Sequence, residues 1–296
     1  MKLCALCIVL ALTACNAVSG KAGGTTTTAA LKTPPRRVGG TYAAPQVSSN
    51  WAGYVVRRGV TAANRAFNSA SGTWRMPKVT CAAQGSSAAF WVGIGGFSPS
   101  SPSLQQLGAS ADCSPGGGAS YRLWTEIVPA PAHFISMKVA PGDTLSASVR
   151  VTGRVVTLAM RNLSRGTRYS ARVEVAHAVD ASSAEWIAEA PALCRTASQC
   201  QVVPLSNFGR VSFSNISTAV GSHVGRLLDP FWTTTPVVLV SSAGSSRYVA
   251  ATNPSGAIPN RIPSPARSFT VAYSSHVGGT VPTSPLLGAP LPDWVH

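Results

Sequence analysis

The sequence predicts an all-β protein, a sandwich of two antiparallel sheets packed on each other, and three observations support this. Between about residue 48 and about residue 275, the chain contains some dozen short runs rich in Val, Thr, Trp, Tyr and Phe. Gly, Pro, Ser and Asn separate the runs, as is typical of turns between strands. Apolar residues almost nowhere recur at helical spacing. This length is ample for one domain with a sizeable core.

Each run justifies one expected strand, because β-branched and aromatic residues favour extended backbone. In chain order, the expected strands cover residues 51–56, 71–76, 88–94, 121–128, 144–151, 154–160, 168–175, 184–190, 209–215, 235–241, 247–252 and 268–274. The stretch Val151-Thr152-Gly153-Arg154-Val155 is typical of a tight hairpin turn between two of them.

The two ends of the chain predict segments outside this domain. Lys2, an apolar run and Leu12-Thr13-Ala14-Cys15 resemble a lipoprotein signal peptide over residues 1–14, with Cys15 lipidated. An ordinary secretory signal with an incidental Cys15 remains the alternative. Residues 15–47 predict a Thr/Ala/Pro-rich tether or propeptide, and residues 276–296 a Pro-rich tail. We therefore expect an exported chain, lipid-anchored to the cell envelope or secreted after processing.

Four cysteines remain once Cys4, Cys7 and Cys15 are assigned to the signal and its cleavage site. An even number in an oxidising compartment predicts disulfides, and four cysteines allow three pairings. Nearness in sequence favours Cys81–Cys113 and Cys194–Cys200. The spacing does not suit a zinc site.

The charge balance is strongly basic, with 24 Lys plus Arg against 9 Asp plus Glu. The basic residues are scattered along the sequence and do not interleave with aromatic residues, so we expect the charge to indicate neither a nucleic-acid partner nor an anionic membrane surface. Acid unfolding mostly protonates carboxylates that are paired in the native state. A chain with so few carboxylates is therefore expected to tolerate low pH.

Alternation along three of the expected strands gathers Trp, Gly and Glu on one face. Glu185 and Glu189 share a face in AEWIAEA, about 13 Å apart, which is too far for a catalytic pair with each other. Trp124 shares a face with Glu126, and Trp91 with the glycines that follow it. Such a face predicts a substrate-binding groove, with the aliphatic faces forming the core. The alternative for each Glu is a solvated residue on the outside of a strand.

Several motifs, taken in order, resemble the glutamic peptidases, also called eqolisins, and their bacterial branch in particular. They are SSNWAGYVV, FWVGIGG, QQLG, WTEIVPAP with APGD, SSAEWIAEAP and PLSNFGRVSFSN. The resemblance covers residues 48–275 and implies a sandwich related to the concanavalin A-like lectin folds. It implies an endopeptidase that acts on polypeptides at acidic pH, without metal or cofactor, and we expect a monomer.

The resemblance also implies which residues do the chemistry. The catalytic Gln falls on Gln106, with Gln105 as the register alternative, and the catalytic Glu on Glu189. Glu185 is then a supporting or exposed residue. Glu189 would activate water as a general base, and the amide of Gln106 would stabilise the oxyanion. The substrate-binding positions fall on Trp91, Trp124 and Glu126.

The chain departs from the family pattern at two positions where Asp is frequent, namely Gly95 and Ser110, with Asp112 two residues further on. Their loss is expected to shift the working pH upward or to lower activity. Two other functions remain open. One is a non-catalytic, surface-anchored module that binds peptide or glycan. The other is a glycosidase that uses Glu126 and Glu189 as its two carboxylates. No His lies beside a GxSxG turn or in an HExxH motif.

Overall fold

The computed structural model describes residues 41–58, 66–98, 100–196, 199–241, 248–249 and 255–275. The predicted signal peptide, Cys15, residues 15–40 of the predicted tether and the tail at 276–296 lie outside these residues. Over the described ranges the chain forms strands and turns and no helix, so none of it is a helix able to span a membrane. The all-β prediction is confirmed.

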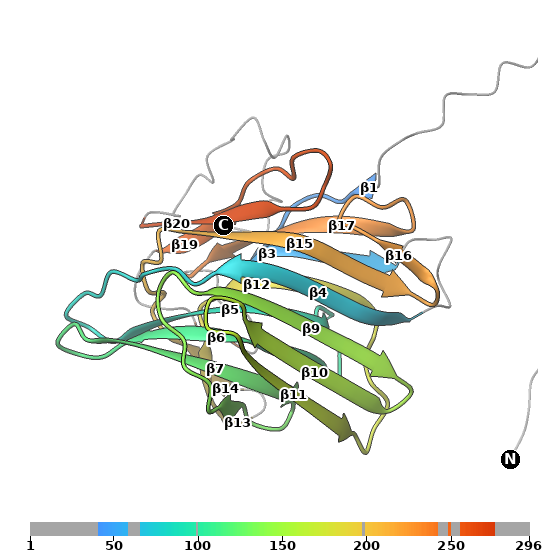
Figure 1. Cartoon of the computed structure of the whole chain (residues 1–296). Helices are drawn as coiled ribbons and strands as arrows, with labels where there is room; N and C mark the ends of the chain where they lie inside the picture. Colours follow the sequence, from blue (N-terminus) through green and yellow to red (C-terminus); the bar gives the residue numbers. More distant parts are fainter. Residues whose placement is uncertain are drawn as a thin grey trace, which may run out of the picture. The chain divides into compact units, whose positions relative to one another are not determined.

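Most strands belong to one continuous 17-stranded sheet that folds over on itself (Figure 1). The half that we call the front sheet contains, in spatial order, β17 (Trp232–Val240), β3 (Trp51–Arg58), β12 (Ser183–Glu189), β5 (Ser86–Gly95), β6 (Leu104–Cys113), β7 (Ala119–Val128) and β8 (His133–Ile135). All of these neighbours are antiparallel.

The other half, the back sheet, continues from β17 through β19. Its spatial order is β19 (Gly256–Pro259), β20 (Phe269–Ser274), β15 (Arg210–Val220), β4 (Phe67–Arg75), β9 (Thr144–Thr152), β10 (Val155–Asn162) and β11 (Thr167–Glu174). Short strands extend the sheet: β1 (Thr41–Tyr42) and β2 (Gln46–Ser48) run parallel to β17, and β16 (His223–Gly225) pairs with β15. A separate small sheet contains β13 (Ala192–Thr196), β14 (Gln199–Val202) and β18 (Tyr248–Val249).

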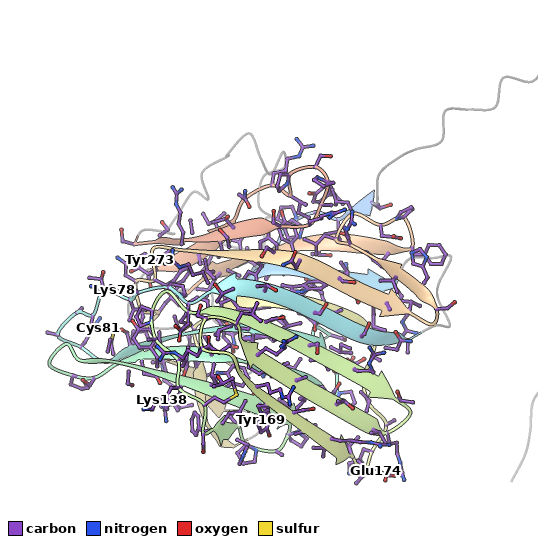
Figure 2. All side chains as sticks on the ribbon, in the orientation of Figure 1. Lys78, Cys81, Lys138, Tyr169, Glu174 and Tyr273 are labelled. Carbon is purple, nitrogen blue, oxygen red and sulfur yellow. A yellow bond between two sulfur atoms is a disulfide. The ribbon has the colours of Figure 1, made fainter. Side chains whose placement is uncertain are left out.

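The main core lies between the two halves of the sheet, where one face of every long strand is apolar. Val149 of β9 and Val92 of β5 belong to it and are fully buried. Trp186 of β12 also points into this core, and its indole N–H donates to the Ser71 carbonyl at 2.8 Å. Truncating a buried aromatic of this kind costs about 3–5 kcal/mol. Figure 2 shows the side chains that both halves contribute.

The sequence-based strands agree with the structure in most places, including the hairpin in which Thr152 pairs with Val155 around Gly153. Two differences matter. Strand β6 was not predicted, because Leu104-Gln105-Gln106-Leu107-Gly108-Ala109-Ser110 has no β-branched or aromatic residue. Pairing with long strands on both sides makes it extended nonetheless. The ordered chain also begins before residue 48, since β1 and β2 already pair with β17.

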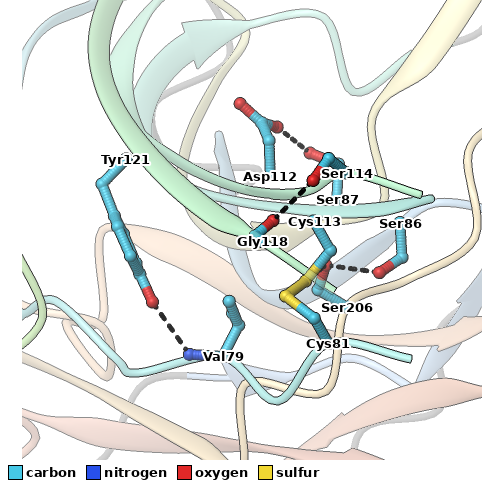
Figure 3. The surroundings of a disulfide bond; sticks show 10 residues. All are labelled: Val79, Cys81, Ser86, Ser87, Asp112, Cys113, Ser114, Gly118, Tyr121 and Ser206. Carbon is cyan, nitrogen blue, oxygen red and sulfur yellow. Dashed lines mark hydrogen bonds between the residues drawn. A yellow bond between two sulfur atoms is a disulfide. The ribbon is translucent and has the colours of Figure 1, made fainter. Parts of the chain in front are cut away.

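The predicted Cys81–Cys113 disulfide is confirmed, with Cα atoms 5.4 Å apart (Figure 3). It ties the loop before β5 to the end of β6. The Tyr121 hydroxyl accepts a hydrogen bond from Val79 N at 3.1 Å beside it. For the second predicted pair, Cys194 lies opposite Cys200 in the β13–β14 ladder, and Cys200 is disulfide-bonded. The side chain of Cys194 lies outside the described atoms.

Candidate active site

The outer face of the front sheet carries most residues that the sequence singled out, arranged in three rows across strands β12, β5, β6 and β7. Because side chains alternate, residues two apart on each strand share this face, which we call the site face. The first row is Glu189, Ala89, Ser110 and Arg122; the middle row is Ile187, Trp91, Gly108 and Trp124; the third row is Glu185, Gly93, Gln106 and Glu126.

Glu189 is partly buried, and both of its carboxylate oxygens have donors. Asn50 Nδ2 donates to Oε1 at 2.9 Å, and Trp91 Nε1 donates to Oε2 at 2.7 Å. Asn50 is itself held, since the Ser48 hydroxyl donates to its Oδ1 at 3.2 Å. Ser48 also accepts from Trp51 N at 3.0 Å, in a tight turn that starts β3. The carboxylate is thus fixed in one orientation by neutral donors.

The surroundings of Glu189 strongly favour its protonated form. Burial raises the pKa of Glu189 to about 8, and the Glu126 carboxylate adds to the rise, while hydrogen bonds from Trp91, Trp51 and Asn50 oppose it. A like charge nearby disfavours ionisation, so Glu126 and Glu189 resist ionising together.

Trp91 forms the buried floor of the site face. A Cβ built on Gly93 would lie 2.8 Å from the Trp91 ring, and one on Gly108 would lie 2.6 Å from Trp91 Cβ. These glycines therefore leave space for the indole, and not only for a substrate as the sequence suggested. Trp51 covers the ring edge-on at 4.9 Å between centroids, and Trp91 is fully buried. Trp91 therefore contacts Glu189 and not the solvent.

Gln106 and Glu126 form a hydrogen-bonded pair on neighbouring strands. Gln106 Nε2 donates to Glu126 Oε2 at 2.6 Å, while Gln106 Oε1 is buried without a partner. Burial raises the pKa of Glu126, and the hydrogen bond from Gln106 partly opposes the rise. Because an amide nitrogen carries two N–H groups, one remains for another acceptor.

Gln105, the register alternative, faces the opposite side of β6. It is fully buried beside Ile94 and Asp180. With its amide oriented to satisfy its neighbours, the nitrogen donates to the Asp180 and Ile94 carbonyls, and the oxygen accepts from the Ser103 hydroxyl. All of its hydrogen-bonding capacity serves the loop around Asp180.

Glu185 is not exposed, contrary to one of the two sequence-based expectations. It is fully buried, and neither oxygen has a hydrogen-bond partner of normal geometry among the described residues. Burial raises its pKa well above the usual value, a hydrogen bond with Ser183 opposes the rise, and Asp180 adds to it. Sequence alternation places Glu185 on the site face correctly but does not reveal that the folded chain buries it completely.

The two departures from the family pattern have different structural settings. Gly95 has φ +82°, and an added Cβ would lie 2.4 Å from the Asp180 carbonyl, so no larger side chain fits. The Asp180 carboxylate instead accepts from Gly96 N at 3.1 Å, directly beside that position. Ser110 donates to Asp112 at 3.2 Å, and Arg122 pairs with the same carboxylate at 2.9 Å. The Asp180 carboxylate thus lies near Gly95, and the Asp112 carboxylate lies near Ser110.

Sequence reasoning assigned no role to Asn50 and Trp51, although both lie in the motif SSNWAGYVV. A polar Asn directly before a strand was the available signal. Around the site face, the described residues contain no group of three or more His, Cys, Asp or Glu side chains that could hold a metal ion.

Comparison with known proteins gives a family and a fold. The Peptidase A4 family matches residues 49–235 of the chain. A crystal structure of scytalido-glutamic peptidase with a transition state analog inhibitor is similar at TM-score 0.58 and 21% identity, covering 77% of this chain and 99% of that chain. The structure of SCP-B, a member of the eqolisin family, in complex with the tripeptide Ala-Ile-His gives TM-score 0.54 and 19% identity over the same shares. No curated protein matches the chain. At these identities the structures show the shared sandwich fold.

Proposed function

The chain belongs to the peptidase A4 family, the glutamic peptidases, and on that premise we propose that Glu189 and Gln106 carry out the hydrolysis of peptide bonds. One observation carries the assignment. Both residues project from the same face of the front sheet, at the positions that the family motifs indicate; the register places them in the first and third rows, and Glu185 is the acid in the row of Gln106. The family match makes the chain a peptidase; the roles below are our proposal.

In the proposed reaction, ionised Glu189 removes a proton from a water molecule as the water attacks the carbonyl carbon of the substrate. The free N–H of Gln106 Nε2 donates to the carbonyl oxygen as it becomes an oxyanion. Glu189 then returns its proton to the leaving nitrogen, which breaks the C–N bond and leaves a carboxylic acid and an amine.

The neighbouring residues hold this pair in place. Glu126 accepts from Gln106 and so fixes the orientation of its amide. Gln105 is a poorer candidate for the oxyanion donor, because the loop around Asp180 occupies its whole amide. Trp51, Trp124 and Val128 supply apolar surface from one cluster on the site face for an extended polypeptide.

We propose a working pH above the mild acid that the sequence suggests. A pKa of about 8 leaves Glu189 protonated in acid in the free protein. The base role then depends on the ionised fraction, so we propose that kcat/KM rises with pH from the acid range into the neutral range. Because its pKa is raised, ionised Glu189 is also a stronger base than the carboxylate of a solvated Glu.

Cleavage of a denatured protein tests the assignment. The purified chain, Glu189→Gln and Gln106→Ala are incubated with reduced casein between pH 3 and pH 9, values that span the usual Glu pKa and the raised one. Fragments are counted by mass spectrometry. The controls are Glu174→Gln and Gln84→Ala, two exposed residues of the same types. Loss of cleavage in both site variants, with unchanged folding by circular dichroism, supports the proposal. Full activity in Glu189→Gln overturns it.

The same experiment separates the alternatives. Casein binding without cleavage by the unmodified chain would favour the non-catalytic module, and release of reducing sugar from polysaccharide would favour a glycosidase that uses Glu126 and Glu189.

We also propose export with a lipid on Cys15, on the sequence pattern at residues 12–15. Mass spectrometry of the mature N-terminus tests this: an acylated Cys15 is expected, and an unmodified N-terminus at any other residue contradicts it.

A further inference from the structure

The back sheet brings together arginines that are scattered in the sequence. Arg150 of β9, Arg161 of β10 and Arg168 and Arg172 of β11 are all exposed; on β9 and β10 the residues on the opposite face are mostly buried and apolar, and on β11 Tyr169 and Ala171 are half-buried. The register places Arg161 opposite Arg168, and Arg172 opposite Thr157, which in turn lies opposite Arg150. All four therefore lie on the outer face of β9–β11, which we call the arginine face.

The centre of the arginine face consists of small side chains. Between the two arginine rows lies a row of Ser148, Ala159 and Ser170. The rows are four residues apart on each strand, or roughly 13 Å, and neighbouring strands are separated by about 4.8 Å. The four guanidinium groups therefore surround a shallow patch of side chains too short to cover them. In the view of Figure 2, Glu174 marks the far end of β11.

The charges on this face are not neutralised by the described part of the chain. Glu174 pairs with Arg154 at 3.1 Å in the hairpin turn, and Asp143 pairs with Arg165. No described carboxylate forms an ion pair with any of the four arginines. Like charges placed directly opposite each other in a sheet, as Arg161 and Arg168 are, destabilise it. An anionic partner would remove this cost.

We propose that the arginine face docks on the surface of an anionic phospholipid bilayer. The four positive charges are spread over one broad exposed sheet face, and the face has no aromatic side chain on which bases could stack. A basic patch adds electrostatic attraction to anionic lipids beside any lipid anchor. The arginine face is therefore the complement of the lipid proposed at Cys15.

The placement of the arginine face also suits the proposed peptidase. The core lies between the two sheets, so the outer face of the back sheet and the site face point in opposite directions. A chain docked through its arginine face would leave Glu189 and Gln106 turned toward the solvent. The active site would then act on polypeptides that approach the membrane.

An alternative explanation of these arginines is protection of a sheet edge, since exposed edge strands often carry charged residues that prevent aggregation. It accounts for Arg168 and Arg172, because β11 is the edge strand. It does not account for Arg150, which lies two strands inward on β9.

Co-sedimentation with vesicles tests the proposal on the full chain. The vesicles contain either phosphatidylcholine alone or equal parts of phosphatidylcholine and phosphatidylglycerol. The variant is Arg161→Gln with Arg168→Gln, and the matched control is Arg226→Gln with Arg261→Gln, two exposed arginines outside β9–β11. The N-terminal segment is common to all three proteins, so differences between them arise from the arginines. Thermal unfolding checks that each protein is folded.

We expect phosphatidylglycerol to increase binding of the unmodified chain, and added salt to weaken it. Each arginine near such a surface contributes about fivefold to partitioning, so the variant should bind roughly 30-fold more weakly. The control should keep nearly the original partitioning. Equal loss in variant and control, binding that ignores phosphatidylglycerol, or equally tight and arginine-dependent binding to duplex DNA would each overturn the proposal.

Discussion

Replacing Trp91 by Phe isolates one hydrogen bond to the proposed general base. The substitution removes the N–H that donates to Glu189 Oε2 at 2.7 Å and keeps an aromatic ring above Gly93. A hydrogen bond to a charged group contributes about 1.5–3 kcal/mol. Since one pKa unit corresponds to about 1.4 kcal/mol, the pKa of Glu189 should rise by roughly 1–2 units.

The assay is kcat/KM for a quenched fluorescent peptide as a function of pH. Its acid limb reports the pKa of the essential base in the free enzyme. We expect Trp91→Phe to move the midpoint of this acid limb to a pH roughly 1–2 units higher. At pH values below the midpoint, kcat/KM should fall about 10- to 100-fold, whereas its plateau at high pH should stay the same. The control is Trp124→Phe, which changes an aromatic of the same face that is not hydrogen-bonded to Glu189. A limb that stays in place, or that moves in both variants alike, would refute the reasoning.

Three further predictions concern stability. The pKa of Glu185 in the folded state lies above its usual 4.5, so above that pH the folded state binds more protons than the unfolded state, and the free energy of unfolding falls as pH rises. Glu185→Gln should remove this slope, which is at most about 1.4 kcal/mol per pH unit. Urea unfolding at several pH values measures it. Replacing Cys81 and Cys113 by Ser opens a loop of 32 residues, and the unfolding free energy should fall by about 3–4 kcal/mol, whereas an unchanged midpoint would exclude a stabilising disulfide. Gly95→Asp, which restores a residue frequent in the family, should lower the melting temperature, because its Cβ would collide with the Asp180 carbonyl; a variant as stable as the original would contradict that geometry.

The strands were predictable from sequence where side chains themselves favour extended backbone. Strand β5 contains Phe90, Trp91, Val92 and Ile94, which favour extended backbone and predict it, whereas β6 consists mainly of small and polar residues that do not. The conformation of β6 comes from its two neighbours, which is tertiary information. Yet β6 carries Gln106, so a central strand of the site was known only through the family motif.

The site was predictable as a set of residue types but not as a set of environments. Alternation placed Glu185 and Glu189 on one face, and the structure agrees. It did not reveal that Glu185 is fully buried or that Asn50 holds Glu189. Burial depends on which loops cover a strand, and the contact of Asn50 joins residues 139 positions apart.

The arginine face illustrates the same limit for charge. Arg150 and Arg161 are separated by a hairpin, and Arg161 and Arg168 by another, so the sequence shows isolated arginines. The antiparallel register brings these arginines together on one face of the sheet. A prediction from charge runs alone therefore missed a patch that hairpin geometry creates.

The position of β12 determines when during biosynthesis the peptidase can first become active. This strand, residues 183–189, inserts between β3 and β5, which end at residues 58 and 95. Until it has left the ribosome, the two flanking strands have no common partner and the carboxylate of Glu189 has no donors. Such long-range pairing also slows folding. The proposed site therefore cannot form until more than half of the chain has been synthesised.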